Sequence, residues 1–255
     1  MNIAIITGAS SGLGMEYAKT ILEENDTLDE IWLIARRKER LERFAAEHKE
    51  KKIRTVSLDL SRMDSFSKLD ELLRDKKPII KVLINNAGVE RTGRFEDMTQ
   101  ENILNMIDLN VKGTTMVNKI CFPYMKRGSY EILTSSVSSF CPVPSQTVYS
   151  ASKAYIKYMG RALQIEMKKK GINVLTLCPG NMNTEMNPQG MFSQSKMVDS
   201  LPFLDLKVLT KKSLRKARKG YAAYTPGLFY KLYEFGCKLL PISCMLGIVK
   251  KSYDE

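Results

Sequence analysis

The strongest constraint on the fold of this chain is an alternation of short apolar runs with helix-length amphipathic stretches. The runs, which have the character of strands, lie at residues 3–6, 31–34, 55–58, 81–84, 130–134 and 173–177. The segments between them that suit helices lie at residues 15–24, 38–49, 65–73, 101–125 and 149–169. Strands joined by helix-length connections are typical of a parallel sheet with right-handed crossovers. The sequence therefore predicts an α/β fold, a doubly wound parallel sheet with helices on both faces.

The organisation expected from the pattern is one domain over residues 1–255, because no repeat or low-complexity linker divides the chain. After Pro179 the alternation stops, and we predict a lid at about 181–206 and a basic and apolar C-terminal extension at about 207–255. A hydrophobic fraction of 44% excludes a disordered or disulfide-scaffold protein. The five cysteines lack zinc or redox spacing, and the single histidine, His48, lies in a charged stretch, so no metal site is expected. The first apolar run is too short for a signal peptide or a membrane span, so we expect a cytoplasmic protein.

A glycine-rich turn, TGASSGLG at residues 7–14, follows the first apolar run directly. Glycines permit a tight turn, and the free N–H groups at the start of the next helix suit a pyrophosphate. The spacing differs from the general G-x-G-x-x-G fingerprint, but the position after a buried strand favours the same use. The residues expected to contact a cofactor here are Gly8, Ser10, Ser11, Gly12, Leu13 and Gly14.

The end of the second predicted strand indicates which nicotinamide cofactor is used. An acidic residue there would bind the ribose hydroxyls of NAD, whereas an arginine accommodates the 2′-phosphate of NADP. The chain has Ala35 followed by Arg36 and Arg37, so it offers no carboxylate and two guanidinium groups. We therefore expect NADP(H) in preference to NAD(H), although the two arginines could merely solvate a helix start.

Tyr149 and Lys153 stand four residues apart on a predicted helix and so share one face. A phenol is a weak acid at neutral pH, and a neighbouring ammonium lowers its pKa. Such a tyrosine can give a proton to a carbonyl oxygen or take one from an alcohol. Ser136 follows the strand at 130–134, at the sheet edge where open α/β sheets bind ligands, and its hydroxyl could hold the substrate oxygen.

Several ordered motifs resemble those of the short-chain dehydrogenase/reductase family, in its Tyr-x-x-x-Lys branch. They run from Thr7 to about Thr184: the glycine turn, Asp59-Leu60, Asn85-Asn86-Ala87-Gly88, Asn110, Ser136 thirteen residues before Tyr149, and Pro179-Gly180 followed by Thr184. The resemblance implies a Rossmann-like fold. It also implies cofactor contacts from Asp59, Leu60, Asn86, Ala87, Gly88, Tyr149, Lys153, Pro179, Gly180, Met182 and Thr184. Met182 stands where the family usually has Val or Ile, and Ser11 where many NADP-using relatives carry a basic residue.

The roles that the resemblance implies form a catalytic tetrad. Tyr149 would be the general acid and base, and Ser136 would orient and polarise the substrate carbonyl. Lys153 would lower the pKa of the tyrosine and hold the nicotinamide ribose, and Asn110 would anchor a water in the proton relay. Ser135 is an adjacent candidate for the serine role, but the thirteen-residue interval favours Ser136.

Other functions fit the chain less well. Ser150-Ala-Ser-Lys153 matches the Ser-x-x-Lys of penicillin-recognising enzymes, but their Ser-Asp-Asn and Lys-Thr-Gly elements are absent. A non-catalytic NADP-binding regulator would typically lose the tyrosine or the lysine, whereas this chain has both Tyr149 and Lys153. Much of the net charge of +12 is concentrated in residues 207–219 without interleaved stacking aromatics, so nucleic-acid binding is not expected. The apolar run after Pro226 could rest on a membrane surface, but packing on the body or on a partner subunit is preferred.

The substrate that we expect is a small apolar carbonyl compound or alcohol. The C-terminal third loosely resembles relatives that act on steroid ketones or fatty acyl chains, which implies a hydroxysteroid or a 3-oxoacyl chain. The predicted lid is rich in methionine and bulky apolar residues, which suit a hydrophobic ligand. Residues 140–144 would line the opposite wall. Members of the family usually pair through the helices near 101–125 and 149–169, so the resemblance implies a dimer or a tetramer. Because the basic, lengthened C-terminus could obstruct the further tetramer contact, we expect a homodimer.

Overall fold

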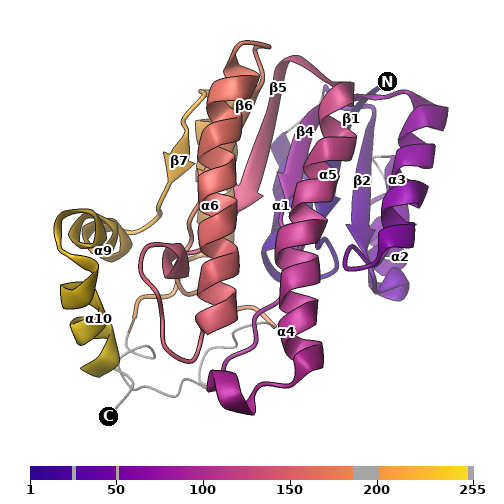
Figure 1. Ribbon diagram of the computed structural model, residues 1–255. Coiled ribbons are helices and arrows are strands. Elements are labelled where there is room, and N and C mark those ends of the chain that lie inside the picture. Colours follow the sequence, from indigo (N-terminus) through magenta and orange to yellow (C-terminus); the bar gives the residue numbers. More distant parts are fainter. Residues whose placement is uncertain (25–26, 50–51, 186–200, 252–255) are drawn as a thin grey trace.

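A computed structural model describes residues 1–24, 27–49, 52–185 and 201–251 (Figure 1). Within these residues a seven-stranded sheet has the order β3-β2-β1-β4-β5-β6-β7, and all its pairings are parallel. The strands are β1 (Asn2–Thr7), β2 (Glu30–Ala35), β3 (Ile53–Ser57), β4 (Ile79–Asn85), β5 (Met125–Thr134), β6 (Asn173–Leu177) and β7 (Ala223–Tyr224). The predicted doubly wound parallel sheet is therefore confirmed.

Helices cover both faces of this sheet, as Figure 1 shows. The helices on one face are α1 (Gly12–Glu24), α2 (Lys38–Glu47) and α8 (Leu206–Arg218). The opposite face carries α3 (Met63–Lys76), α5 (Thr114–Cys121) and α6 (Thr147–Lys168), and α4 (Gln100–Met106) packs against α6. The strands are buried on both sides because successive residues feed different cores: Ala4 and Ile6 face the first set of helices, and Ile3 and Ile5 face the second. Near-continuous apolar runs are what such a sheet requires.

The single helix predicted at 101–125 is wrong in its interior and at its end. α4 passes into a π-helical segment, η2 (Ile107–Gly113), which continues as α5 and the 3₁₀ turn η3 (Phe122–Tyr124). Strand β5 then begins at Met125, earlier than predicted. Its pairing with β4 jumps from Met125 to Tyr130, and Gly128 within the gap has a φ of +85°. The polar residues of this bulge hide the start of the strand from a hydrophobicity pattern.

The basic stretch at 207–219 belongs to the body of the fold and not to an extension of it. It forms α8, which buries Leu209, Leu214 and Ala217. Two hydroxyl pairs join α8 to α1: Tyr17 with Ser213 at 2.6 Å, and Thr20 with Thr210 at 2.7 Å. The next element, β7, was not expected from the sequence; its two residues extend the sheet beside β6.

Two helices follow the sheet, α9 (Leu228–Leu239) and α10 (Ile242–Lys251), and they project from the β7 edge (Figure 1). Across the described part of the chain, no helix combines the length and the apolar character that crossing a membrane demands. Shorter 3₁₀ turns, η1 (Phe95–Asp97) and η4 (Val137–Ser139), lie in the connections after β4 and β5. The predicted lid lies partly outside the described residues, since only 181–185 and 201–206 of it are described.

The chain order reverses between β1 and β4: β2 and β3 lie on one side of β1, and β4 to β7 lie on the other. At such a switch point the loops leaving the carboxyl ends of neighbouring strands run in opposite directions and leave a crevice. The glycine turn after β1 and the Asn86–Gly88 segment after β4 both leave the sheet at this point. The fold thus places the two predicted cofactor motifs at one site.

Candidate active site

The glycine turn after β1 is held in a conformation that needs its glycines. Gly8 has a φ of +68°, and a Cβ on Gly14 would lie 2.3 Å from the Gly8 carbonyl oxygen. Thr7 joins this turn to the loop after β4, because its Oγ1 accepts hydrogen bonds from the backbone N–H groups of Asn86 at 2.9 Å and Ala87 at 3.0 Å. The start of α1 is thereby left open toward the crevice, as a pyrophosphate requires.

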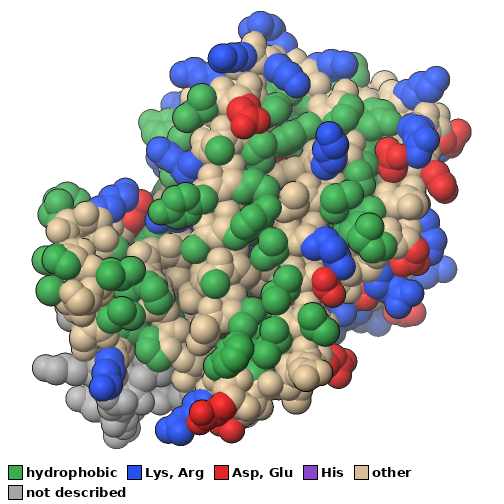
Figure 2. Space-filling view, in the orientation of Figure 1, with side chains coloured by type: hydrophobic (Ala, Val, Ile, Leu, Met, Phe, Trp, Pro, Cys, Tyr) green, Lys and Arg blue, Asp and Glu red, His purple; other side chains and the backbone are tan. Residues whose placement is uncertain are grey.

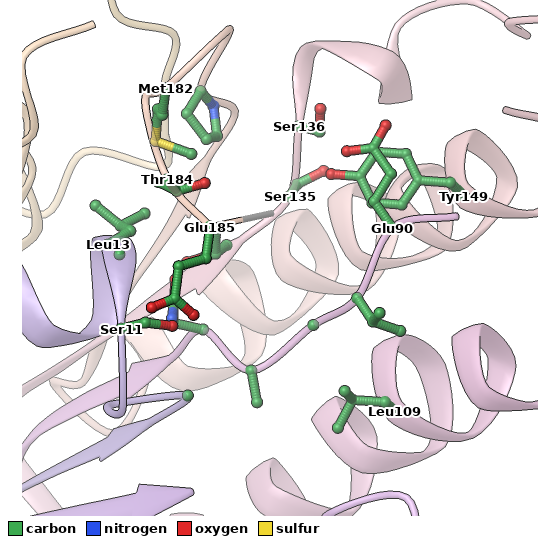
Figure 3. Close-up of a pocket in the computed structure, with 18 of the residues that line it drawn as sticks. Ser11, Leu13, Glu90, Leu109, Ser135, Ser136, Tyr149, Met182, Thr184 and Glu185 are labelled. Carbon is green, nitrogen blue, oxygen red and sulfur yellow. The ribbon is translucent and has the colours of Figure 1, made fainter. Parts of the chain in front are cut away.

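A cavity of about 730 Å³ fills the crevice, and Figure 3 shows part of its lining. That volume is in the usual range for ligand sites. The cavity collects most of the predicted site residues: Gly8, Ser10, Ser11, Gly12, Leu13, Arg36, Arg37, Leu60, Asn86, Ala87, Gly88, Ser136, Tyr149, Pro179, Gly180, Met182 and Thr184. Residues far apart in sequence therefore meet in one elongated pocket, with the glycine turn at one end and Tyr149 at the other.

Four predicted residues, Gly14, Asp59, Asn110 and Lys153, lie behind the lining. Gly14 is packed beneath the turn, and Asp59 accepts hydrogen bonds from the Ser61 N–H at 3.0 Å and the Ser61 hydroxyl at 2.7 Å. Asn110 and Lys153 are buried just under Gly88, where a Cβ would lie 3.2 Å from both the Asn110 Oδ1 and the Lys153 Nζ. These two side chains therefore reach the pocket only through the space above that glycine.

Arg37 lies closer to the glycine turn than Arg36 does. Its guanidinium donates to the Ser10 hydroxyl at 2.9 Å and 3.1 Å and to the Ser11 hydroxyl at 2.6 Å. The Arg36 side chain is more exposed and lies 4.0 Å from an Asp59 oxygen. Of the two arginines expected to contact a 2′-phosphate, Arg37 is the one already built into the turn.

Glu185 adds a carboxylate to this end of the pocket that sequence reasoning missed. It pairs with Arg37 at 2.7 Å and also with Arg40, and the two guanidinium groups hold its pKa below the ordinary value. Figure 3 shows the side chain reaching toward Ser11. A phosphate at this place would share Arg37 with Glu185. No local motif distinguishes Glu185 from an ordinary surface glutamate.

The hydroxyl groups of Tyr149 and Ser136 meet at the other end of the pocket. Tyr149 lies in the first turn of α6, and Ser136 lies directly after β5. The Ser136 side chain lies close enough to Tyr149 to lower the pKa of the phenol, and the Ser136 Oγ accepts from the Ser138 N–H at 3.1 Å. The neighbouring Ser135 donates to the Lys153 carbonyl oxygen at 2.7 Å and so fastens β5 to α6. The geometry places Ser136, rather than Ser135, beside the tyrosine.

Lys153 holds the end of β5, and Asn110 holds the segment that leaves β4. The Lys153 Nζ donates to the Thr134 carbonyl oxygen at 3.1 Å. Asn110 lies in the π-helical segment, and its side chain exchanges hydrogen bonds with the backbone of Val89, at 2.8 Å to the N–H and 2.9 Å to the carbonyl oxygen. π-helical turns often mark functional positions, since the extra residue turns a side chain toward a site. The period of the sequence gave no sign of this one.

Burial dominates the titration of these groups. It raises the pKa of Tyr149 above its usual range, and the nearby Glu90 raises it further, while the neighbouring Ser136 hydroxyl lowers it. Burial also lowers the pKa of Lys153 to about 8. The Tyr-x-x-x-Lys spacing predicts a lowered pKa for the tyrosine, but in this structure burial raises the pKa of Tyr149 instead. At neutral pH Tyr149 therefore carries its proton and is a donor.

Glu90 is the second carboxylate of the pocket that sequence reasoning missed. Figure 3 shows it beside Tyr149, with its carboxylate toward Ser136. Its Oε1 accepts from the Gln146 Nε2 at 2.7 Å, and the Gln146 Oε1 accepts from the Ser138 hydroxyl at 3.0 Å. Burial raises the pKa of Glu90 to about 7 in spite of the Lys153 ammonium. Glu90 directly follows the Asn-Asn-Ala-Gly-Val run, but the motif itself does not indicate an acidic residue there.

The base of the predicted lid is fixed by a tyrosine from the C-terminal helices. Tyr230 of α9 is fully buried, its hydroxyl donates to the Pro202 carbonyl oxygen at 2.8 Å, and it accepts from the Asn181 N–H at 3.0 Å. A Cβ on Gly180 would lie 2.0 Å from the ring of Tyr230. The described ends of the lid are also joined to each other, because the Leu204 N–H donates to the Asn181 carbonyl oxygen at 2.8 Å.

The walls on the substrate side are mixed in polarity. Val137, Met182 and Phe203 supply apolar surface, and Ser138, Ser145, Gln146 and Glu90 supply polar surface. The expectation that residues 140–144 line this wall is wrong, since the lining passes from Ser138 to Ser145. Phe140 instead packs against Tyr233 of α9, with ring centroids 6.0 Å apart, and lies beneath the Lys157 ammonium. The apolar residues predicted between 186 and 200 lie outside the described residues.

The site holds a proton donor and a hydroxyl at one end and phosphate-binding groups at the other. The described residues include no cluster of three or more His, Cys, Asp or Glu side chains that could hold a metal ion. The arrangement can position a carbonyl oxygen between Ser136 and Tyr149 and can transfer a proton to it. The open glycine turn, with Arg37 beside it, fits the phosphates of a dinucleotide.

Comparison with known proteins agrees with this geometry. The model of the short chain dehydrogenase family matches residues 2–191. An uncharacterized oxidoreductase of Staphylococcus epidermidis is 30% identical over 205 residues, which are 80% of this chain and 87% of that protein. The solved short-chain dehydrogenase of Sphingobium yanoikuyae in complex with NADPH is 25% identical, with a TM-score of 0.79 over 98% of this chain and 96% of that one. A bulky-bulky ketone specific alcohol dehydrogenase of Comamonas testosteroni shares the fold at 23% identity, with a TM-score of 0.75 over 98% of this chain and 94% of that one. The chain belongs to the short-chain dehydrogenase family and is an oxidoreductase of that family.

Proposed function

We propose that the protein is an NADP(H)-dependent oxidoreductase that interconverts a ketone or aldehyde and an alcohol on a largely apolar molecule. The observation that carries the proposal is that Ser136 and Tyr149 are neighbours in the lining of the same pocket as the glycine turn. Bound NADPH would supply the hydride. The protein must then bind the carbonyl group, polarise it and deliver one proton to its oxygen.

The residues of this chain divide these tasks. Ser136 holds the substrate oxygen with its hydroxyl, and Tyr149 donates the proton as the oxygen becomes an alkoxide. The raised pKa of Tyr149 suits the donor role, because the phenol stays protonated until charge develops on the substrate. Lys153 and Asn110 lie beneath Gly88, where they would support the nicotinamide ribose and a relay water, respectively.

The preference for NADP(H) rests on Arg37 with Ser10 and Ser11. A guanidinium that already bonds both serine hydroxyls is preorganised for a phosphate at that corner. The relative from Sphingobium yanoikuyae was solved with NADPH, which supports the same choice. Asp59 faces Ser61 rather than the pocket, so no carboxylate from β2 or β3 is placed to select NAD.

The test is consumption of NADPH, with NADH in parallel, by the purified protein across steroid ketones, 3-oxoacyl thioesters and small aldehydes. We expect NADPH to be oxidised selectively with one class. Tyr149→Phe should abolish turnover and leave the affinity for NADPH within a fewfold of the wild type, as measured by fluorescence titration. Substantial turnover by that variant would contradict the assignment of the proton donor.

The outer face of the α4 and α6 helices supports the expected homodimer. Large apolar side chains are exposed there, among them Leu104, Tyr158 and Ile165, which are 57%, 77% and 67% exposed. Figure 2 shows hydrophobic side chains spread over this face of the molecule. Burying them against a second copy would remove apolar surface from water. We therefore propose that two copies pair through these helices.

The exposed side of α9 favours a second candidate, a reductase that works at a membrane surface. Leu228, Leu232, Phe235 and Leu239 form a stripe along the helix and are each 60% exposed or more, while Tyr230 on the opposite side is buried. An amphipathic helix of this kind can rest in a lipid interface. Sedimentation with anionic phospholipid vesicles tests this form: binding that Phe235→Glu abolishes would support it, and a protein that stays in the supernatant would exclude it.

A further inference from the structure

The carboxylate of Glu90 stands where a substrate would pass the catalytic hydroxyl groups. It leaves the β4 loop directly after Val89, whose backbone is held by Asn110. Figure 3 shows it alongside Tyr149, and both residues line the same pocket. A substrate oxygen seated between Ser136 and Tyr149 would therefore place its neighbouring carbon atoms close to this carboxylate.

One hydrogen bond holds the Glu90 carboxylate in place and leaves its other oxygen without a donor among the described residues. Oε1 accepts from the Gln146 amide at 2.7 Å, and Gln146 is itself held by the Ser138 hydroxyl. Among the described residues no side chain or backbone group donates to Oε2. Glu90 lines the pocket, so a ligand that enters the pocket can donate a charge-assisted hydrogen bond to this free oxygen.

The nearby charge of Lys153 decides which kind of donor fits. The Lys153 ammonium lies close enough to lower the pKa of Glu90. A cationic substrate group would be repelled by this positive charge, whereas a hydroxyl would not. A neutral hydrogen-bond donor on the substrate is therefore favoured.

We propose that Glu90 is a specificity-determining residue that accepts a hydrogen bond from a hydroxyl group next to the reacting carbonyl, so that the preferred substrates are α-hydroxy ketones. This inference rests on the proposed ketone reductase activity and narrows its substrate class. The apolar wall formed by Val137, Met182 and Phe203 would take the remainder of the molecule. Desolvation raises the pKa of Glu90 to about 7, so the carboxylate is largely ionised at pH 8 and is then a strong acceptor.

Three aryl ketones of nearly the same shape test the proposal: acetophenone, 2-hydroxyacetophenone and 2-methoxyacetophenone. The hydroxy compound donates a hydrogen bond, and the methoxy compound has a similar electron-withdrawing oxygen that cannot donate. kcat/KM is measured at pH 8 with NADPH for the wild type, for Glu90→Gln and for the matched control Glu96→Gln. Glu96 is exposed and lies outside the pocket. Because the intrinsic reactivity of each ketone is the same for every variant, ratios between ketones report the contact with residue 90.

We expect the wild type and Glu96→Gln to prefer the hydroxy ketone to the methoxy ketone. In Glu90→Gln the new amide oxygen can keep the hydrogen bond from Gln146. The NH₂ group of the new side chain then points into the pocket in place of the free carboxylate oxygen. The ratio of kcat/KM for the hydroxy over the methoxy ketone should then fall roughly tenfold to a hundredfold, the usual effect of losing a charge-assisted hydrogen bond. Thermal unfolding of the variant establishes that it is folded, and Glu90→Leu provides a second readout with the same expected fall.

Two results would overturn the inference. An unchanged ratio in Glu90→Gln and Glu90→Leu, with all three ketones reduced, would refute the role of Glu90 and leave the proposed reductase standing. If the protein oxidises NADPH in the presence of no ketone of the three, the result would count against the proposed ketone reduction and therefore against this inference.

Discussion

Glu131 is a buried carboxyl group without hydrogen-bond partners among the described residues, and replacing it should change how stability depends on pH. It lies on β5 and is fully buried, beside Asn85 of β4 and Cys121 of α5. Neither carboxyl oxygen makes a well-formed hydrogen bond among the described residues. Burial raises the pKa of Glu131 from 4.5 to about 8, although the Asn85 amide opposes part of that rise. The folded protein therefore prefers the protonated, neutral acid.

The sign and size of the effect follow from that difference. Below pH 4.5 the carboxyl is protonated in both the folded and the unfolded chain, and its contribution to stability is fully present. As the pH rises toward 8 the unfolded chain releases the proton first, so the free energy of unfolding falls. A pKa raised from 4.5 to about 8 corresponds to roughly 5 kcal/mol in total, of which roughly 3 kcal/mol accrues between pH 5.5 and pH 8.

Glu131→Gln removes the titration and keeps the shape of the side chain. Urea unfolding followed by the fluorescence of Trp32, the single tryptophan and a fully buried one, gives the free energy of unfolding at each pH. The free energy of unfolding of the variant, relative to that of the wild type, should increase by roughly 3 kcal/mol as the pH rises from 5.5 to 8. Glu166→Gln makes the same chemical change at an exposed position of α6 and should show no such trend. A difference between Glu131→Gln and wild type that does not vary with pH would refute the reasoning.

Three further outcomes follow from the site and the surface. Arg37→Ala should raise the KM for NADPH roughly tenfold or more and the KM for NADH much less, because it removes charge-assisted bonds to a 2′-phosphate; an equal rise for both cofactors in steady-state assays would contradict this. Tyr230→Phe keeps the ring against Gly180 but loses both lid hydrogen bonds. The variant should have a free energy of unfolding lower by about 1–2 kcal/mol and a higher substrate KM. A variant identical to the wild type in both quantities would show that these two hydrogen bonds do not stabilise the lid. The proposed dimer predicts that the wild type is a dimer and Tyr158→Glu a monomer in light scattering, and a monomeric wild-type protein would refute it.

The parts of the fold that sequence reasoning predicted are those with a local signal. The glycine turn, the six main strands and the spacing of Ser136, Tyr149 and Lys153 are all written in short segments. The structure places these three residues together because β5 and α6 are adjacent in space. Local pattern was also enough to expect helices on both faces, since a strand that is apolar throughout has to be covered on both sides.

The parts that were missed depend on contacts between distant segments. Glu90 becomes a pocket residue only because Gln146, 56 residues later, holds it there. Glu185 meets Arg37 across 148 residues, and the burial of α8 depends on hydroxyl groups of α1. The π-helical segment is invisible for another reason: a single extra residue in a helical turn does not disturb an amphipathic pattern enough to be noticed.

The contact between Gly180 and Tyr230 links a segment inside the range matched by the family model, residues 2–191, to a helix outside that range. The space that a side chain at 180 would need is filled by the aromatic ring of residue 230. A methyl group could be accepted at 180 only if the ring withdrew, and then the hydroxyl could no longer reach Asn181 and Pro202. The two positions should therefore vary together among relatives that keep these C-terminal helices. A relative with a different C-terminus has to fill that space by another route, and its lid would rest on a different support.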